Sequence, residues 1–271
     1  MLPRLLRTAL LLLLLSALPI APAGARDRGA DGNFEQRESS HFILFQDVDI
    51  DRAGGWRGSV QFERDVLAVL EQGYDQLDAR LGLRPPRKIQ VWVYDPAIFD
   101  ATFAGLFRFR IAGFYGEAIR VRGDTVVTAR LSRTLHHELV HAAFDAAAPS
   151  LVLPAWLNEG IAEWFENRTH GKRGLSAAEW AYLRQAHQGG FWIPVTSSGA
   201  SNFGWLRGNA AALAYLESYA LVDALVRRRG ERDLPRFIQT LVRTRNLDRA
   251  LRRVYKVSLA DLEPDLRAEL D

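Results

Sequence analysis

The sequence contains no cysteine among its 271 residues. This absence excludes disulfides, thiolate metal ligands, iron–sulfur clusters and a cysteine nucleophile. Any metal site must therefore use histidine, carboxylate or main-chain oxygen ligands. Lysine is also scarce, since Arg accounts for 32 of the 35 basic residues. These arginines are interpreted as scattered along the chain, which favours an ordinary solvated surface over a nucleic-acid-binding stripe, so no nucleic-acid partner is expected.

The first 25 residues have the composition of a secretory signal peptide. Arg4 and Arg7 precede a run of Leu and Ala, and Ala23-Gly24-Ala25 is typical of a cleavage site. A retained membrane anchor is the alternative, but the run is short for a span of about 20 residues. We expect an exported protein, periplasmic or secreted, with no stable membrane insertion after cleavage. The mature chain would carry 33 basic against 32 acidic residues.

Hydrophobic residues make up 48% of the chain and charged residues 25%, which indicates a folded protein. We expect a flexible mature N-terminus over 26–40 and one catalytic domain over 41–271. Within that domain, residues 41–128 are strand-rich and residues 129–271 are mostly helical, an α+β arrangement with a small mixed sheet. Strands are predicted around 41–46, 88–94, 114–115 and 119–121, and helices over 60–81, 129–148, 154–168, 176–187, 208–229, 233–243, 247–255 and 259–270.

The segment His137-Glu138-Leu139-Val140-His141 lies inside a helical apolar pattern. Residues four apart share one face of a helix, so His137 and His141 can bind one Zn²⁺ from the same side. Glu138 points about 100° round the helix and is predicted to be the general base for hydrolysis. His136 falls on the other face and is interpreted as a surface or outer-layer residue. Chance occurrence of this short motif is the alternative, so its structural context matters.

A third metal ligand is needed, and Glu159 is the candidate. It follows His141 after a connection that contains Pro149 and Pro154, long enough for a second helix to return antiparallel. Glu163 lies one turn later on the same face. Since a metal-binding histidine donates its other N–H to a partner, Glu163 is the candidate partner of His137. Asn158 is assigned to the same outer layer, and one Zn²⁺ per chain is expected.

These two motifs together resemble those of the gluzincin metallopeptidases. His-Glu-x-x-His followed by Asn-Glu-x-x-x-Glu is similar to thermolysin-like enzymes, and Trp156-Leu-Asn-Glu-Gly-Ile-Ala is similar to the aminopeptidase N branch. The overall likeness is greatest to the small bacterial peptidase MA-like domain, over about residues 88–241. The resemblance implies a thermolysin-like core and a zinc-dependent peptidase.

The resemblance also implies a second catalytic group. In the aminopeptidase branch a tyrosine at the start of a helix stabilises the oxyanion, and Tyr215 matches that place. A phenol donor there would stabilise the transition state. Tyr219, one turn later, is the rival, and ordinary core packing is the alternative for both. The match departs from the aminopeptidases at Glu217-Ser218, where they usually have Lys-Gly.

The sequence indicates the substrate-binding residues less clearly than the metal ligands. Residues 112–121 are predicted to form an edge strand along which an extended peptide could lie. Glu117 is a candidate for binding a substrate amine, although a solvated acid is the simpler interpretation. A Gly/Ser-rich loop over 189–204 is long enough to line a cleft. Its aromatic residues Phe191, Trp192 and Phe203, with Trp205, are interpreted as mainly buried.

The main hypothesis is a zinc peptidase with a peptide or protein substrate. One alternative is an inactive peptidase-fold binding module, and another is a zinc hydrolase of a non-protein amide such as a cell-wall peptide, since fold likeness does not settle substrate. The natural substrate, endo- or exopeptidase action and the oligomeric state stay open.

Overall fold

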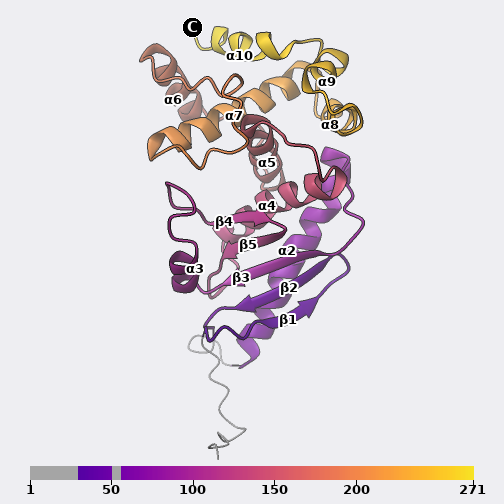
Figure 1. Ribbon diagram of the computed structural model, residues 1–271, viewed down its shortest axis with the longest axis vertical. Helices are drawn as coiled ribbons and strands as arrows, with labels where there is room; N and C mark the ends of the chain where they lie inside the picture. The colour runs from indigo at the N-terminus through magenta and orange to yellow at the C-terminus, as the bar shows by residue number, and fades with distance from the viewer. Residues whose placement is uncertain (1–29, 51–55) are drawn as a thin grey trace, which may run out of the picture.

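A five-stranded sheet forms the base of the N-terminal half (Figure 1). The computed structural model describes residues 30–50 and 56–271, so the predicted signal peptide lies outside the described residues. The strand order is β1-β2-β3-β5-β4, and the strands are β1 (Glu35–Glu38), β2 (Phe42–Asp47), β3 (Ile89–Tyr94), β5 (Ala118–Arg122) and β4 (Gly113–Gly116). β2, β3 and β5 run parallel, whereas β1 and β4 pair antiparallel at the two edges.

Alternation along the strands explains which face of the sheet is covered. Phe42, Leu44, Val91 and Val93 alternate with less buried neighbours and belong to the core. Helix α2 (Trp56–Leu81) packs against β2, and α4 (Ala129–Ala147) packs against β5 and α2. A short helix, α3 (Pro96–Thr102), begins at Asp95, whose side chain caps it. The sheet therefore serves as a platform for α4.

The C-terminal half is helical and lies above α4 (Figure 1). Its elements are α5 (Ala155–Thr169), α6 (Ala177–Gln188), α7 (Asn209–Arg229), α8 (Asp233–Thr244), α9 (Leu247–Val254) and α10 (Leu259–Ala268). α5 packs against both α4 and α7. Gly160 makes the close approach of α5 and α7 possible, because a Cβ there would collide with the backbone carbonyl of Ser218. This contact places the middle of α7 beside α5.

The α+β fold class predicted from the sequence is confirmed. Predicted and observed helices agree closely at most ends, because caps such as Thr128 and Ser176 and the terminating Gly230 stand where the apolar patterns begin or end. The prediction of a flexible segment over 26–40 is wrong for Glu35–Glu38, which pairs with β2 as β1. The polar composition of this stretch hid an edge strand. Among the described residues, none of the helices has the length and apolar character to span a membrane.

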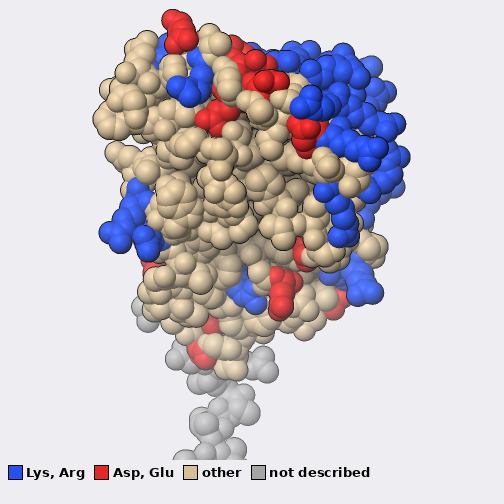
Figure 2. Space-filling view, turned by 45° about the horizontal axis from the view of Figure 1, so that its top comes forward, with Lys and Arg blue, Asp and Glu red and all other residues tan. Residues whose placement is uncertain are grey.

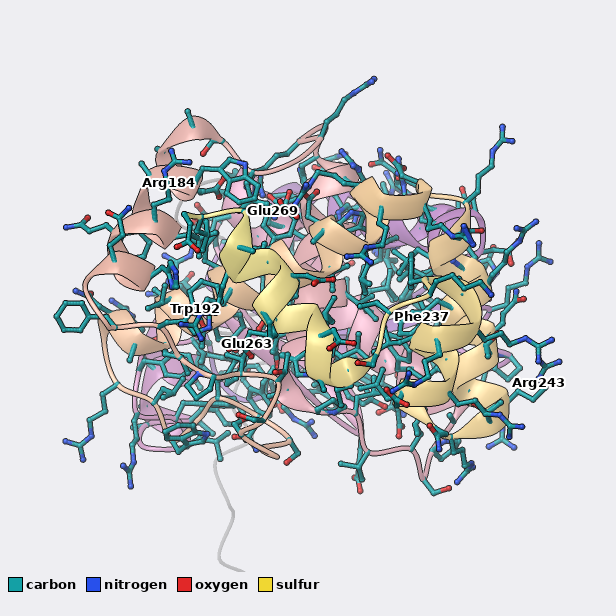
Figure 3. The ribbon with its side chains drawn as sticks, turned by 90° about the horizontal axis from the view of Figure 1, so that it is seen from above. Arg184, Trp192, Phe237, Arg243, Glu263 and Glu269 are labelled. Atoms are coloured by element: carbon teal, nitrogen blue, oxygen red, sulfur yellow. The ribbon has the colours of Figure 1, made fainter. Side chains whose placement is uncertain are left out.

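The loop over 189–204 is fastened to the C-terminal helices. Trp192 donates its indole N–H to Glu263 at 2.6 Å (both labelled in Figure 3), and the backbone N–H of Ile193 donates to Glu217 at 3.0 Å. Burial raises the pKa of Glu217 to about 8. The prediction that the aromatic residues of this region are buried holds for Phe203, but it is wrong for Phe191, which is 75% exposed, and for Trp205, which is 49% exposed.

Surface charge is unevenly distributed. Lys and Arg gather at the upper right of Figure 2, where α8 and α9 lie, whereas the centre of that face carries few charges. The expectation of scattered arginines is therefore wrong for this part of the surface, because α8, α9 and the end of α7 carry many of them within one short segment of the chain.

Candidate active site

Helix α4 carries the first two residues of the site. Thr128 caps its N-terminus by accepting a hydrogen bond from the backbone N–H of Leu131 at 3.2 Å. Leu131, Leu135 and Leu139 are buried. His137 and His141 project together from a neighbouring face, with ring centroids 5.0 Å apart. The helix thus presents two imidazoles on one side, as their spacing predicted.

Glu159 comes to the two histidines from the antiparallel helix α5. Its Oε2 lies 3.2 Å from His137 Nε2 and 3.6 Å from His141 Nε2. One ligand atom from each residue lies within 4.8 Å of the others. Two imidazole nitrogens and one carboxylate oxygen are a donor set that suits Zn²⁺, and the three side chains are about nine-tenths buried. The residues therefore fit a divalent metal ion.

A cleft of about 700 Å³ opens in front of this cluster. The three residues line it together with Glu138, and β4, the edge strand, forms one wall through Gly113–Gly116. Ser201, Asn202 and Gly204 from the 189–204 loop line it as well, as the sequence predicted. Three protein ligands on one side and an open cleft on the other leave a position for a substrate.

Glu138 is 6% exposed and sits on the cleft wall next to both histidines. Burial raises its pKa above the usual value for a glutamate, while the two nearby histidines act in the opposite direction. A raised pKa brings a carboxylate nearer to the range in which it can accept and release a proton. Its position and environment suit the role of a general base.

The pKa values of the cluster show how strongly its charges interact. Burial opposes ionisation of Glu159, but His141 and His137 outweigh it and hold the pKa of this carboxyl far below its usual range. Burial likewise lowers the pKa of His137, yet its hydrogen bonds to Glu159 and Glu166 raise it well above the usual value. Glu159 is therefore ionised, and a metal ion that binds here would release protons from His137 and His141, whose pKa values are both raised.

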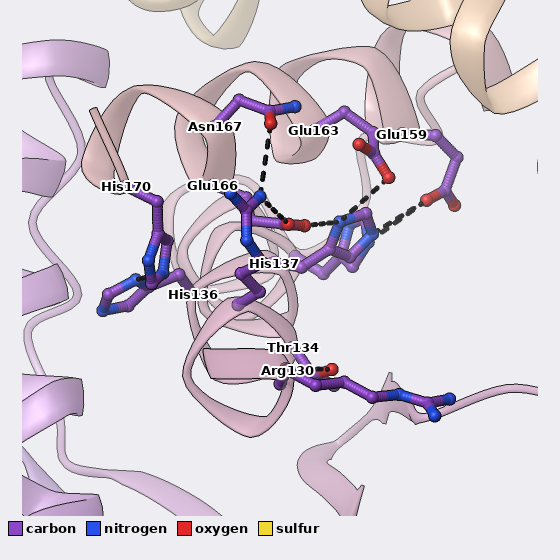
Figure 4. Close-up of polar contacts among 11 residues, drawn as sticks. Arg130, Thr134, His136, His137, Glu159, Glu163, Glu166, Asn167 and His170 are labelled. Carbon is purple, nitrogen blue, oxygen red and sulfur yellow. Dashed lines mark hydrogen bonds and ion pairs between the residues drawn. The ribbon is translucent and has the colours of Figure 1, made fainter. Parts of the chain in front are cut away.

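The Nδ1 atoms of His137 and His141, which face away from Glu159, have polar partners. Asn158 Oδ1 lies 3.1 Å from His141 Nδ1, so the geometry supports the outer-layer role predicted for Asn158. Two carboxylates approach His137 Nδ1, Glu163 at 3.8 Å and Glu166 at 3.4 Å (Figure 4). Such partners fix the ring orientation and the tautomer of a metal-binding histidine.

Glu166 is a residue that the sequence reasoning missed. Arg133 Nη1 donates to Glu166 at 3.0 Å and to Asn167 at 3.3 Å. This contact fixes the Glu166 carboxylate beside His137 (Glu166 and His137 are labelled in Figure 4). Burial raises the pKa of Glu163 to about 7, whereas the pKa of Glu166 is lowered because His137 and Arg133 outweigh its burial. Glu166 is thus the nearer and the more fully ionised of the two. The signal in the sequence was its place three residues after Glu163, on the same helix face.

Of the two candidate tyrosines of α7, only Tyr215 lines the cleft. Tyr215 lines the cleft, and its ring lies 6.4 Å from that of His137 and 5.6 Å from that of Phe203. Burial, then the carboxylates Glu159 and Glu138, raise its pKa well above the usual value, so the phenol keeps its proton. Tyr219 is 3% exposed, packs under Lys172 at 4.6 Å and is not among the cleft residues. The geometry favours Tyr215 as a donor toward the cleft.

His136 is not at the surface as predicted, because it is 1% exposed. Its Nε2 donates to the backbone carbonyl of Val69 at 2.9 Å, and its Nδ1 lies 3.1 Å from His170 Nε2. Gly73 on α2 provides the space, since a Cβ there would lie 2.7 Å from the His136 ring. His136 therefore joins α4 to α2 and does not belong to the outer layer of the metal cluster.

Glu117 lies outside the cleft lining. It occupies the turn between β4 and β5 with a positive φ of 63°, and its side chain is exposed. The structure thus gives no support to the idea that Glu117 binds a substrate amine, and the interpretation as a solvated acid fits its position.

Comparison with known protein families agrees with this geometry. Residues 70–271 match the family model of the peptidase MA superfamily. Because this match covers most of the chain, the chain belongs to the peptidase MA superfamily, which confirms the gluzincin-type resemblance found in the motifs. No curated protein matches the sequence. Family membership indicates a metallopeptidase-like domain.

Proposed function

We propose that the protein is a zinc-dependent peptidase that hydrolyses peptide bonds with Glu138 as general base. The observation that carries this proposal is the convergence of His137, His141, Glu159 and Glu138 on one open cleft. When bound, Zn²⁺ would polarise the scissile carbonyl and lower the pKa of water. His137, His141 and Glu159 would hold the ion. Asn158 and Glu166 would fix the orientation of the two imidazole rings through their Nδ1 atoms.

The chain's own residues suffice for the remaining steps. Glu138 takes a proton from the attacking water and later delivers it to the leaving amine. Tyr215 donates its hydroxyl proton in a hydrogen bond to the oxygen on which negative charge develops. β4, as an unpaired sheet edge along the cleft, offers backbone groups to an extended peptide. We further propose, from the N-terminal segment, that the protein is exported.

The direct test is hydrolysis of a mixed peptide library by the purified protein. We expect cleavage products that disappear on treatment with a chelator and return when zinc is added. Cleavage that persists after the metal has been stripped would contradict the proposal. Complete inactivity of the zinc-loaded, folded protein would favour the binding-module alternative.

Tyr215→Phe tests the oxyanion donor. Removing one such donor costs about 10²–10³-fold in kcat, with little change in KM, because the hydrogen bond strengthens only in the transition state. Tyr219→Phe is the matched control on the same helix and should keep kcat within a few-fold. A larger loss of kcat in the control than in Tyr215→Phe would assign the role to Tyr219 instead.

Glu166→Gln and Glu163→Gln distinguish the two candidate partners of His137. Loss of such a partner weakens metal affinity by about 10–100-fold. We expect that loss for Glu166→Gln and a smaller one for Glu163→Gln, measured by competition for zinc against a chelating dye. The reverse order would show that Glu163 is the partner, as predicted from the sequence.

A further inference from the structure

One segment of the chain carries a strong excess of positive charge. Residues 227–256 contain eleven Lys or Arg and three Asp or Glu, whereas the rest of the chain has 24 and 29. This segment spans the end of α7, all of α8 and α9 and their connections. All eleven cationic side chains are exposed, and α8 and α9 lie on the side where Lys and Arg gather in Figure 2. The excess is thus concentrated on one part of the surface.

Most of these cations are available to a partner. Five of them pair with carboxylates: Arg227, Arg228, Arg229, Arg236 and Arg252. The other six make no ion pair within the described part of the chain, and we call them the basic surface: Arg232, Arg243, Arg245, Arg249, Arg253 and Lys256. Five of the six are arginines, whose guanidinium groups bind carboxylates with two parallel hydrogen bonds.

The basic surface reaches the wall of the cleft. Arg245, in the turn between α8 and α9, donates to Ser150 Oγ at 2.7 Å. Ser150 immediately precedes Leu151, Val152 and Leu153, which line the cleft. Val152 is 78% exposed and lies at the rim. A polypeptide that leaves the cleft over this rim would therefore pass close to Arg245, and then toward the rest of the basic surface.

The segment 227–256 has no large exposed apolar side chain that could insert into a membrane or a partner. The large apolar side chains that are exposed among the described residues all lie outside 227–256, since the apolar faces of α8 and α9 are buried. A partner must accordingly be held by charge, through its carboxylates or phosphates. Because Arg245 contacts Ser150 beside the cleft rim, an acidic polypeptide that also occupies the cleft suits this surface better than a bilayer.

We propose that the basic surface is an exosite for an acidic segment of the polypeptide substrate whose scissile bond lies in the cleft. This inference rests on the proposed function and adds a substrate class to it, polypeptides with Asp- or Glu-rich sequence to one side of the cleavage site. Charge complementarity at the rim of a binding site mainly raises the association rate and depends on salt.

Direct binding tests the surface without any catalysis. The probe is a fluorescent ten-residue oligoglutamate, added to the Glu138→Gln protein at low salt. A triple variant with Arg243→Gln, Arg249→Gln and Arg253→Gln should bind it about tenfold more weakly. The matched control replaces Arg87, Arg173 and Arg184, three exposed arginines elsewhere, by Gln and should bind like the parent. Figure 3 shows Arg184 and Arg243 on opposite sides of the molecule.

Activity tests the link to the cleft. A peptide cleaved in the library assay is extended at one end or the other with six Glu or six Ser. A Glu extension at one end should lower KM about tenfold in the wild type without changing kcat. This effect should vanish in the triple variant of Arg243, Arg249 and Arg253, and also at high salt. The control variant should behave as the wild type.

Three outcomes would overturn the exosite. Equal oligoglutamate affinity of the two triple variants is the first, and no KM effect of Glu at either end is the second. The third is adsorption to phosphatidylglycerol vesicles with no oligoglutamate binding, which would assign the surface to a membrane. Absence of cleavage of every library peptide would contradict the proposed function instead, so the two failures are distinguishable.

Discussion

Glu138→Gln is expected to retain one zinc per chain and to lose about 10²–10⁴-fold in kcat. The amide keeps the size and shape of the carboxylate but cannot accept the proton of the attacking water. The Glu138 side chain is buried on the cleft wall beside His137 and His141. It does not belong to the cluster of possible metal ligands that these two histidines form with Glu159. Turnover should fall while the metal content stays unchanged.

Asp145→Asn is the matched control for this prediction. Asp145 also lies on α4 and lines the cleft, one turn after His141, and it accepts a hydrogen bond from the Tyr115 hydroxyl at 2.7 Å. Its replacement removes a carboxylate from the same cleft and should leave kcat close to the wild-type value, because Asp145 does not belong to the group of His137, His141 and Glu159. Wild-type turnover by Glu138→Gln would contradict the general-base role.

Glu159→Ala is expected to lose both the metal and the activity. Its Oε2 lies close to the Nε2 atoms of both histidines, so its removal leaves two ligands where a catalytic zinc needs three. The same change leaves two buried histidines without their shared carboxylate. We expect zinc binding too weak to survive gel filtration and peptidase activity below detection.

Glu117→Gln provides the control, because it removes an exposed glutamate at the end of the cleft-lining strand without touching the cluster. It should keep both zinc and turnover. Circular dichroism of Glu159→Ala must show a folded protein for the comparison to hold. Full zinc content in a folded Glu159→Ala protein would contradict the assignment of this ligand.

The approach of His137, His141 and Glu159 to one another could be predicted from the sequence because its geometry is mostly local. Two histidines four apart need only the α4 helix, and its apolar pattern predicts that helix. Glu159 needed one further inference, that the chain turns at Pro149 and Pro154 and returns antiparallel. The observed α4–α5 pair has that arrangement.

The features that the sequence did not predict depend on long-range packing. Glu163 and Glu166 share one helix face, and Glu166 lies nearer to His137 and is held there by Arg133 of the other helix. His136 is buried because Gly73, far away in sequence, leaves room on α2. A periodic pattern identifies a helix and its faces, but it does not show which neighbour each face will meet.

The edge strand β1 and the basic surface are two charged segments whose neighbours in the fold the sequence pattern did not show. Glu35–Glu38 is polar in sequence and forms a strand because β2 offers it an unpaired edge. The arginines of α8 and α9 are separated in sequence by buried residues such as Phe237 and Leu251, and helix packing brings them to one side. The sequence shows the excess of positive charge over 227–256, but it does not show which part of the surface these side chains reach.

The most direct test of the account is the zinc content of the purified protein from about residue 26 onward, measured by elemental analysis beside Glu138→Gln and Glu159→Ala. We expect about one zinc per chain in the wild type and in Glu138→Gln, and essentially none in Glu159→Ala. A folded wild-type protein that binds no zinc after incubation with the metal would contradict it.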